Sequence, residues 1–329
     1  MFDRTMTPAG PHRRVSLVDL EPGADDFLAA AIKGLSRPDK ALPYRFLYDA
    51  RGSALFDRIT QLAEYYPTRT EVGILRDNAG DIARRVGPAA QLVEPGSGSS
   101  RKVRILLDAL DQPFGYVPID ISRDHLLAAA QRLQDEYPEL KVEAICADFA
   151  QDFVLPPKGP GARAGFYPGS TIGNLAPAEA GLWLAQWARR LGAGAMLLIG
   201  VDLQKPAAIV EPAYDDSQGV TAAFTLNLLE RANRELGADF DISAFRHEAD
   251  YLPDEGRVRI RLRSLRDQRV RIGGRVFELP AGETIHVEDS WKYTVEGFHA
   301  LARRTGFDVL EVWTDPDRLF SVHLLEARS

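Results

Sequence analysis

The sequence predicts an α/β fold with a mostly parallel sheet, joined to a second domain of mixed α+β structure. Two observations predict this architecture. From residue 91 to residue 201, short apolar segments alternate with amphipathic segments, which is typical of successive βαβ units. After Asp202 this alternation stops, and segments with the two-residue periodicity of antiparallel strands follow. The expected boundaries are 72–202 with 293–329 for the first domain, 16–71 with 203–292 for the second, and 1–15 for a flexible tail.

The segment that follows the tail is expected to be helical. Apolar residues from Phe27 to Leu35 recur at helical spacing, and Ser36-Arg37-Pro38 ends the pattern. Two further helices are expected at about 53–62 and 70–85, separated by the aromatic turn Tyr65-Tyr66-Pro67-Thr68.

Five strands of a parallel sheet are expected in the central segment. They are placed at 91–94, 116–119, 142–146, 164–167 and 195–201, and helices follow the first, second and fourth of them at 103–110, 125–137 and 177–191. The fifth strand is almost entirely apolar, as expected for a strand that helices cover on both faces.

The rest of the chain predicts the second domain and a return to the sheet. A helix is expected at 221–236, then two antiparallel strands at 258–265 and 269–277, with a hairpin turn at Gly273-Gly274. A last helix at 294–305 precedes two segments, 308–313 and 319–325, that are expected to form a hairpin on the first sheet.

Composition favours a small-molecule substrate. The chain has 329 residues, a formal net charge of -7 and a single cysteine, Cys146, which is expected to lie buried in a strand. A negative chain lacks the basic field that binds nucleic acid or anionic membranes, and no apolar run approaches the roughly 18 residues of a transmembrane helix. One cysteine suits a reducing compartment, so a cytoplasmic monomer is expected.

The six histidines do not predict a metal site. They are scattered and no H-E-x-x-H motif is present, so we expect no bound metal. The closest ligand-like spacing is His286-Val287-Glu288 on an expected strand, where both outer side chains face the same side and could line the pocket, although an exposed histidine is the simpler expectation.

Three consecutive strand ends carry residues suited to binding a nucleoside. Glu94 leads into a Gly96-x-Gly98 turn, where glycine permits close approach of backbone N–H groups to a ligand. Asp120 ends the next strand, where a carboxylate can bind both ribose hydroxyls, and Asp148-Phe149 ends the third, where they suit an adenine ring. Each residue also has a structural explanation, as a turn, a helix cap or a core side chain. Their joint occurrence at one edge of a Rossmann-like sheet favours the cofactor site.

Two other classes of protein share this pattern. A nicotinamide-dependent dehydrogenase has the same sheet and acidic second strand, but it normally needs the third glycine of G-x-G-x-x-G, which is absent. A noncatalytic binding protein also remains possible at this point, because fold does not determine function.

Several ordered motifs resemble the L-histidine Nα-methyltransferases of ergothioneine biosynthesis, from about residue 42 to residue 325. The motifs that carry the resemblance are Tyr48-Asp49-Ala50-Arg51-Gly52-Ser53, Tyr65-Tyr66-Pro67-Thr68-Arg69-Thr70-Glu71, Gly96-Ser97-Gly98-Ser99-Ser100-Arg101-Lys102, Thr171-Ile172-Gly173-Asn174, Tyr214-Asp215-Asp216 and Glu288-Asp289-Ser290-Trp291-Lys292-Tyr293. The resemblance implies a class I methyltransferase domain that uses S-adenosylmethionine, with a substrate domain built from the N-terminal segment and the insertion.

The resemblance also implies roles for individual residues. It implies that Gly96, Lys102, Asp120, Asp148 and Phe149 bind S-adenosylmethionine. It further implies that Asn174 and Tyr214 hold the α-amino acid, that Tyr65, Glu288 and Ser290 recognise the imidazole, and that Tyr48 and Phe56 surround the amine. Ile260 stands where a methionine can line the imidazole pocket, and Pro95 and Pro168 also depart from the family pattern.

The implied reaction is methylation of the histidine α-amino group, ending in the trimethylated product hercynine. An α-amino group with a pKa of roughly 8 is mostly protonated at neutral pH, so the site must favour the neutral amine. We expect Asn174 and a water near Tyr48 to orient the nitrogen, and Phe56 to leave room for added methyl groups. A methyltransferase for another amino acid or small amine is the alternative.

Overall fold

The computed structural model describes residues 15–20, 27–98, 102–148 and 152–328. Its largest element is an eight-stranded sheet in the order β1-β4-β3-β2-β5-β6-β13-β12. The strands are β1 (Ser16–Asp19), β2 (Gln91–Pro95), β3 (Gly115–Asp120), β4 (Lys141–Cys146), β5 (Arg163–Tyr167), β6 (Met196–Asp202), β12 (Phe307–Thr314) and β13 (Phe320–Ala327). All neighbours are parallel except β13, which runs antiparallel to β6 and β12.

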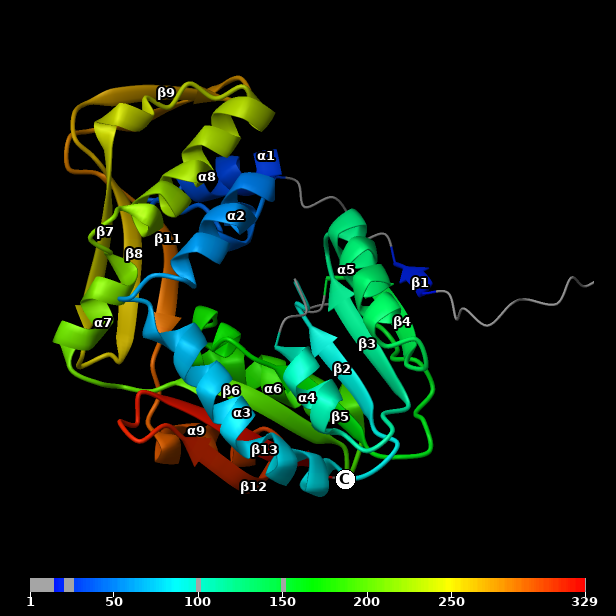
Figure 1. The fold of residues 1–329 in the computed structure, drawn as a ribbon. Coiled ribbons are helices and arrows are strands. Elements are labelled where there is room, and N and C mark those ends of the chain that lie inside the picture. The colour runs from blue at the N-terminus through cyan, green and yellow to red at the C-terminus, as the bar shows by residue number, and fades with distance from the viewer. Residues whose placement is uncertain (1–14, 21–26, 99–101, 149–151, 329) are drawn as a thin grey trace, which may run out of the picture.

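Helices cover both faces of this sheet (Figure 1). Three pack on one face, namely α3 (Tyr66–Val86), α4 (Val103–Ala109) and α5 (Arg123–Glu136), and two on the other, α6 (Pro177–Leu191) and α9 (Val295–Arg304). Each face has its own apolar core, centred on Leu75 and Leu107 on the first and on Trp183 and Trp187 on the second. Two-sided burial explains why β6 reads as an uninterrupted apolar run.

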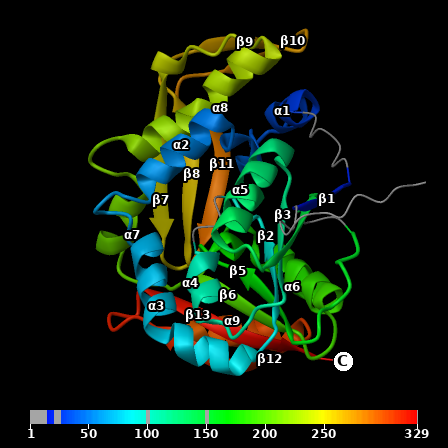
Figure 2. The same ribbon diagram turned by 45° about the vertical axis from the view of Figure 1, so that its right-hand side comes forward.

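A smaller domain stands beside the carboxyl ends of the parallel strands (Figures 1 and 2). Its three-stranded antiparallel sheet has the order β11-β8-β7, and a separate hairpin pairs β9 with β10. The elements are α1 (Phe27–Leu35), η1 (Tyr44–Leu47), α2 (Ala50–Ile59), α7 (Ala207–Tyr214), α8 (Val220–Leu236), η3 (Ile242–Ala244), β7 (Phe245–Leu252), β8 (Arg257–Ser264), β9 (Gln268–Ile272), β10 (Arg275–Leu279) and β11 (Thr284–Trp291). One apolar core joins α1, α2 and α8 to the sheet.

Most predicted elements are present, and the exceptions have physical causes. β1 pairs with β4 at the edge of the large sheet. Residues 16–19 therefore lie with the first domain, whereas the sequence led us to expect them in the second. This strand is short and mostly exposed, so it carries no alternating pattern. The expected break at 71 lies inside α3, because Pro67 starts that helix rather than ending the turn before it. The predicted tail, 1–15, lies outside the described residues except for Val15.

The sequence pattern missed β7 and helix α7. β7 has a histidine, His247, on its buried side, and α7 contains Pro212. Cys146 is buried at the end of β4, as expected. Within the described ranges, no helix is long and apolar enough to cross a membrane.

Candidate active site

The glycine turn after β2 is braced by the strand beside it. Gly96 and Gly98 have φ angles of 68° and 48°, in the left-handed region that glycine adopts without strain. Asp120 accepts hydrogen bonds from Gly98 N at 3.2 Å and from Ser122 N at 3.0 Å. A carboxylate has about four lone-pair positions, so Asp120 still has capacity for a bound diol.

An unpaired buried hydroxyl marks the same turn. Ser97 is 5% exposed, and its Oγ has no hydrogen-bond partner among the described residues. Buried polar atoms in native proteins are nearly always satisfied, so this oxygen fits a polar ligand at the turn. Asp148 is partly buried just beyond β4, while Phe149, the other predicted adenine contact, lies outside the described residues.

Lys102 is held toward the turn by a buried carboxylate. Glu71, on α3, is 1% exposed, forms an ion pair with Lys102, and accepts a hydrogen bond from Gly169 N at 2.8 Å. A Cβ on Gly200 would lie 2.0 Å from Glu71 Oε1, so only glycine leaves space for this carboxylate. Glu94 lies nearby, and burial raises its pKa to about 8 although the Tyr116 hydroxyl donates to it.

Aromatic rings from both parts of the second domain form a continuous cluster. Tyr48 lies 5.7 Å from Phe56 and 5.4 Å from Phe224, measured between ring centroids. Phe56 lies 6.4 Å from Tyr65, which lies 6.4 Å from Tyr214. We call these five rings the aromatic cluster. It brings together four side chains that sequence analysis assigned to the substrate, and it adds Phe224 on α8.

Tyr48 combines a partly exposed side chain with a strongly raised pKa. Its side chain is 41% exposed, yet burial raises its pKa well above the usual value. The two findings agree only if protein surrounds the phenol at longer range while one side stays open to solvent. The raised pKa keeps the hydroxyl protonated at neutral pH.

A β-bulge places the side chains of His286 and Glu288 on different faces of β11. β11 pairs His286 with Arg261 and Glu288 with Ile260, so the strand shifts register between them. The expectation that both side chains share a face is therefore wrong, because the bulge adds a residue to the strand. Glu288 lies directly across from buried Ile260, and burial raises the pKa of its carboxyl to about 8.

Buried charged side chains next to the aromatic cluster connect the two domains. Asp202, at the end of β6, contacts Lys292 Nζ at 2.7 Å and Lys205 Nζ at 2.6 Å. Lys292 also donates to Ser290 Oγ at 2.8 Å and to the Tyr214 hydroxyl, and those two hydroxyls lie 2.9 Å apart. Burial alone would raise the pKa of Asp202, but the two ammonium groups outweigh it and hold that pKa below its usual value.

Asn174 reaches this region on a turn between the domains. It ends η2 (Thr171–Asn174), which follows Gly169 and packs against β11. A Cβ on Gly173 would lie 2.7 Å from Trp291 O, so glycine permits this close approach. The same loop lies beside Lys102, since a Cβ on Gly169 would be 3.5 Å from its Nζ.

The residues predicted to bind the cofactor and those predicted to bind the substrate thus lie on either side of the contact between the domains. Comparison with known proteins decides the class. Residues 27–327 match the sequence profile of the family described as histidine-specific methyltransferase, SAM-dependent. The chain belongs to this family.

Individual relatives agree with this assignment. The chain is 42% identical to the histidine N-alpha-methyltransferase of Mycolicibacterium smegmatis, over 88% of this chain and 92% of that protein. It is 41% identical to the protein of the same name from Mycobacterium tuberculosis, with the same coverage. It is 32% identical to ergothioneine biosynthesis protein 1 of Neurospora crassa, over 91% of this chain but 35% of that longer protein.

Membership of the methyltransferase family confirms the predicted class and cofactor. The enzyme is an S-adenosylmethionine-dependent N-methyltransferase with an α/β fold, and neither a nicotinamide dehydrogenase nor a noncatalytic protein. The eight-stranded sheet, with β13 antiparallel beside β6 and the other strand neighbours on that side parallel up to β1, has the α/β character that the sequence predicted.

The sequence did not indicate the buried charged side chains that lie next to the predicted site residues. The sequence marks Asp202 only as the point where the βαβ alternation stops and Lys292 and Glu71 only as parts of family motifs, and it gives Lys205 no role. Their signal in the sequence was weak, because lysine and carboxylate side chains are normally exposed and only the fold shows that these are buried. Tyr44 was also missed; burial and the nearby Glu288 raise its pKa to about 12.

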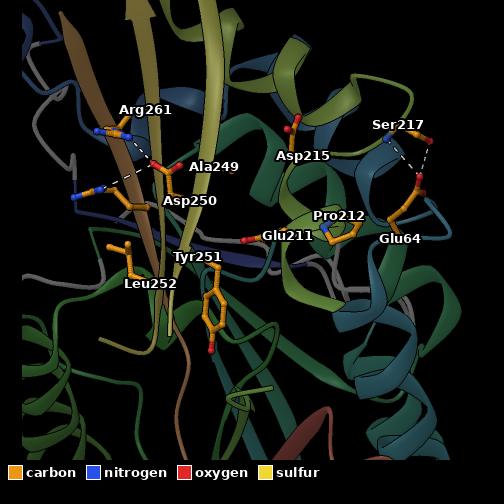
Figure 3. A pocket seen from close by; sticks show the side chains of 11 residues that line it. Glu64, Glu211, Pro212, Asp215, Ser217, Ala249, Asp250, Tyr251, Leu252 and Arg261 are labelled. Atoms are coloured by element: carbon orange, nitrogen blue, oxygen red, sulfur yellow. Dashed lines mark hydrogen bonds and ion pairs between the residues drawn. The ribbon is translucent and has the colours of Figure 1, made fainter. Parts of the chain in front are cut away.

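One hollow of the molecule lies away from the predicted site residues. It has a volume of about 870 Å³ and lies among α7, β7 and β8 (Figure 3). It contains none of the predicted cofactor or substrate residues. Among its charged groups, Asp250 contacts Arg261, and Glu64 accepts from the Ser217 hydroxyl at 2.6 Å.

Proposed function

We propose that this methyltransferase acts on the α-amino group of L-histidine, adds three methyl groups and forms hercynine, the first step of ergothioneine biosynthesis. The observation that carries the proposal is the group formed by Glu288, Ser290 and Tyr214 beside the aromatic cluster. An imidazole has two ring nitrogens that donate or accept hydrogen bonds, and this group offers both a titratable carboxyl and hydroxyls. The names of the relatives support the same substrate.

The cofactor fits the residues at the glycine turn. Asp120, the unpaired Ser97 hydroxyl and Lys102 would hold the ribose and the charged amino acid end of S-adenosylmethionine, with Asp148 and Phe149 at the adenine. When bound, S-adenosylmethionine supplies an electrophilic methyl group on a sulfonium. The turn backbone at Gly96 would approach it closely.

The protein's contribution to the reaction is orientation of the substrate amine. In our proposal Asn174 and Tyr214 hold the substrate, and the ammonium proton leaves to solvent before the nitrogen lone pair attacks. Tyr48 is no general base at neutral pH, because its phenol stays protonated. It therefore orients the amine through hydrogen bonds, and placement within the site lowers the barrier.

Aromatic side chains suit a substrate that gains a permanent positive charge. Phe56 and Phe224 lie 5.9 Å apart between ring centroids and flank Tyr48. The faces of such rings attract quaternary ammonium groups, with a contribution of about 0.5–2 kcal/mol. This property favours continued binding of the partly methylated intermediates.

Calorimetric binding tests the substrate assignment. L-histidine, its Nα-methylated forms and other amino acids are titrated into enzyme with and without S-adenosylhomocysteine. We expect L-histidine and Nα,Nα-dimethylhistidine to bind, and glutamine and phenylalanine to bind at least about tenfold more weakly because they leave Glu288 or Ser290 unpaired. Equal binding of phenylalanine would contradict the proposal and favour the alternative, another amino acid or small amine.

The cytoplasmic location and the monomeric state are further parts of the proposal. Both rest on composition, with one cysteine and a net charge of -7. Light scattering after size exclusion tests the monomer: we expect the mass of one chain, 36.4 kDa. Twice that mass would contradict it.

A further inference from the structure

Lys292 connects the substrate hydroxyls to the cofactor domain. Its side chain is completely buried, directly after β11. Its ammonium group contacts Asp202, Ser290 and Tyr214. An ammonium has three donors and no acceptor, so these three contacts use its full capacity. Lys292 therefore has no donor left for a substrate.

The contacts of Lys292 restrict what the two hydroxyls can do. Tyr214 and Ser290 must both accept from Lys292, because lysine only donates. Their oxygens lie 2.9 Å apart, so one of the two hydroxyl hydrogens is shared between them. The other hydrogen remains for a ligand. The pair therefore presents one donated hydrogen and one accepting oxygen to the substrate.

Surrounding contacts hold this arrangement in place. The carbonyl of Tyr214 accepts from His247 Nε2 at 2.8 Å, and His247 Nδ1 lies 2.9 Å from the Thr225 hydroxyl. On the other side, Asp202 is fixed by Lys205 and by the hydroxyl of Tyr66, which lies 2.9 Å from Oδ2. Neither Lys205 nor Tyr66 contacts Tyr214 or Ser290 in the hydrogen bonds of the described residues.

We propose that Lys292 is a positioning residue that sets the direction of both substrate hydrogen bonds. A substrate carboxylate only accepts, so Tyr214 must donate to it. The shared hydrogen then belongs to Ser290, which leaves Ser290 with a lone pair and makes it the acceptor of an imidazole N–H. The inference rests on the proposed function and adds the direction of these two hydrogen bonds and the residue that imposes it.

The matched variants Lys292→Met and Lys205→Met test the inference. Each removes a buried ammonium beside Asp202, but only the first removes the donor to Tyr214 and Ser290. We expect K292M to raise the KM for L-histidine by about tenfold or more, and K205M by less than about threefold. Both variants are expected to bind S-adenosylhomocysteine like the wild type in calorimetry. Equal KM effects of the two variants, or an unchanged KM in K292M, would overturn the inference.

A double-mutant cycle separates positioning from a general structural effect. In a Tyr214→Phe background, we expect the effect of K292M on KM to fall to about threefold or less, since one of its targets is gone. A full tenfold effect in both backgrounds would overturn the inference. If K292M does not fold, Lys292→Leu, which also removes the donor, takes its place in both comparisons.

The experiments distinguish failure of the proposed function from failure of the role of Lys292. Wild-type enzyme that does not methylate L-histidine overturns the proposed function and this inference together. Wild-type turnover with equal K292M and K205M effects overturns the role of Lys292 alone.

Discussion

Glu288 shows how burial changes the chemistry of one residue. Its carboxyl has a pKa of about 8 because burial disfavours the charged form, while Lys292 acts in the opposite direction. The group therefore titrates near neutral pH, where it can either donate to a neutral imidazole or accept from a protonated one. We expect the substrate affinity to depend on pH through this residue.

The raised pKa of Glu288 predicts that replacing this residue with one that does not ionise changes how the stability of the enzyme depends on pH. The pKa of Glu288 in the folded enzyme lies above its unfolded value of about 4.3, so the folded state binds more protons between these values. This contribution to stability is present below pH 4.3 and is lost as the pH rises through about 8. Relative to Glu288→Gln, the wild type should become less stable over that window.

Urea unfolding of the unliganded enzyme at several pH values measures this difference. Glu278→Gln, on the exposed β9–β10 hairpin, is the control and should show no such trend. A constant difference in unfolding free energy between wild type and E288Q would contradict the raised pKa.

The sequence indicated the residues of the substrate site only through family motifs. Phe56, Tyr214 and Ser290 lie in three separate elements, and Tyr48 and Tyr65 lie just before α2 and α3. Nothing in local periodicity indicates that these residues lie close together. Asp120 was predictable from first principles, because ends of adjacent parallel strands lie at one edge. The structure pairs Asp120 with Cys146 and Pro95 with Ile119, which aligns those ends.

At the scale of elements, several motif residues build the scaffold rather than the site. Asp49 caps α2 by accepting from Gly52 N at 2.7 Å, and it also accepts from Asn227 Nδ2 at 2.8 Å. Asp216 caps α8 in the same way, through Val220 N and Thr221 N. The motifs around Tyr48 and Tyr214 therefore fix the helices that follow these tyrosines in the chain, α2 and α8.

A glycine-to-alanine pair tests the packing of α2. A Cβ on Gly52 would lie 1.7 Å from Leu47 O, whereas a Cβ on Gly73 in α3 meets nothing within 4 Å. We expect Gly52→Ala to destabilise the enzyme by about 3 kcal/mol, because the backbone must move. Gly73→Ala should instead stabilise it by about 0.5–1 kcal/mol through helix propensity. Thermal unfolding of both variants measures this, and similar shifts in Tm would contradict the packing.

A hydrogen-bond chain connects α9, β13 and β6. His299 Nε2 lies 3.0 Å from His323 Nδ1, His323 Nε2 lies 2.8 Å from Ser321 Oγ, and Ser321 donates to Val201 O. Because Ser321 donates to a carbonyl, it accepts from His323 Nε2–H, and His323 Nδ1 then accepts from His299. Burial, together with the charge of His299, lowers the pKa of His323 to about 3.

This hydrogen-bond chain, through the buried His323, predicts that the enzyme loses stability in acid. The folded pKa of His323 lies below the unfolded value of about 6.5, so the unfolded state binds the extra proton first. Stability should fall as the pH is lowered from about 6.5 toward 3. This fall should be smaller in His323→Gln, and it should be unchanged in the control His125→Gln, which alters an exposed residue. An equal fall in wild type and H323Q would contradict the assignment.

At the scale of the whole molecule, the chain passes repeatedly between the domains. α3 begins beside the aromatic cluster and runs along the large sheet, while the charge pair of Asp202 and Lys292 joins β6 to the end of β11. Periodicity predicted the two-domain organisation because the βαβ rhythm stops at Asp202. It did not predict the contact between domains, which depends on buried charges and on glycines such as Gly173.

This interleaving predicts cooperative unfolding. We expect a single calorimetric transition whose measured enthalpy equals the van't Hoff value, because neither domain is a continuous segment. Two resolved transitions would contradict the strong coupling between the domains.

Mass spectrometry of exhaustive turnover tests the central claim most directly. The enzyme is incubated with excess S-adenosylmethionine and an equimolar mixture of L-histidine and the other common amino acids. We predict that histidine alone is consumed and accumulates as the product with three methyl groups on its α-nitrogen. A product with one methyl group at exhaustion, or preferential methylation of another amino acid, would contradict the claim.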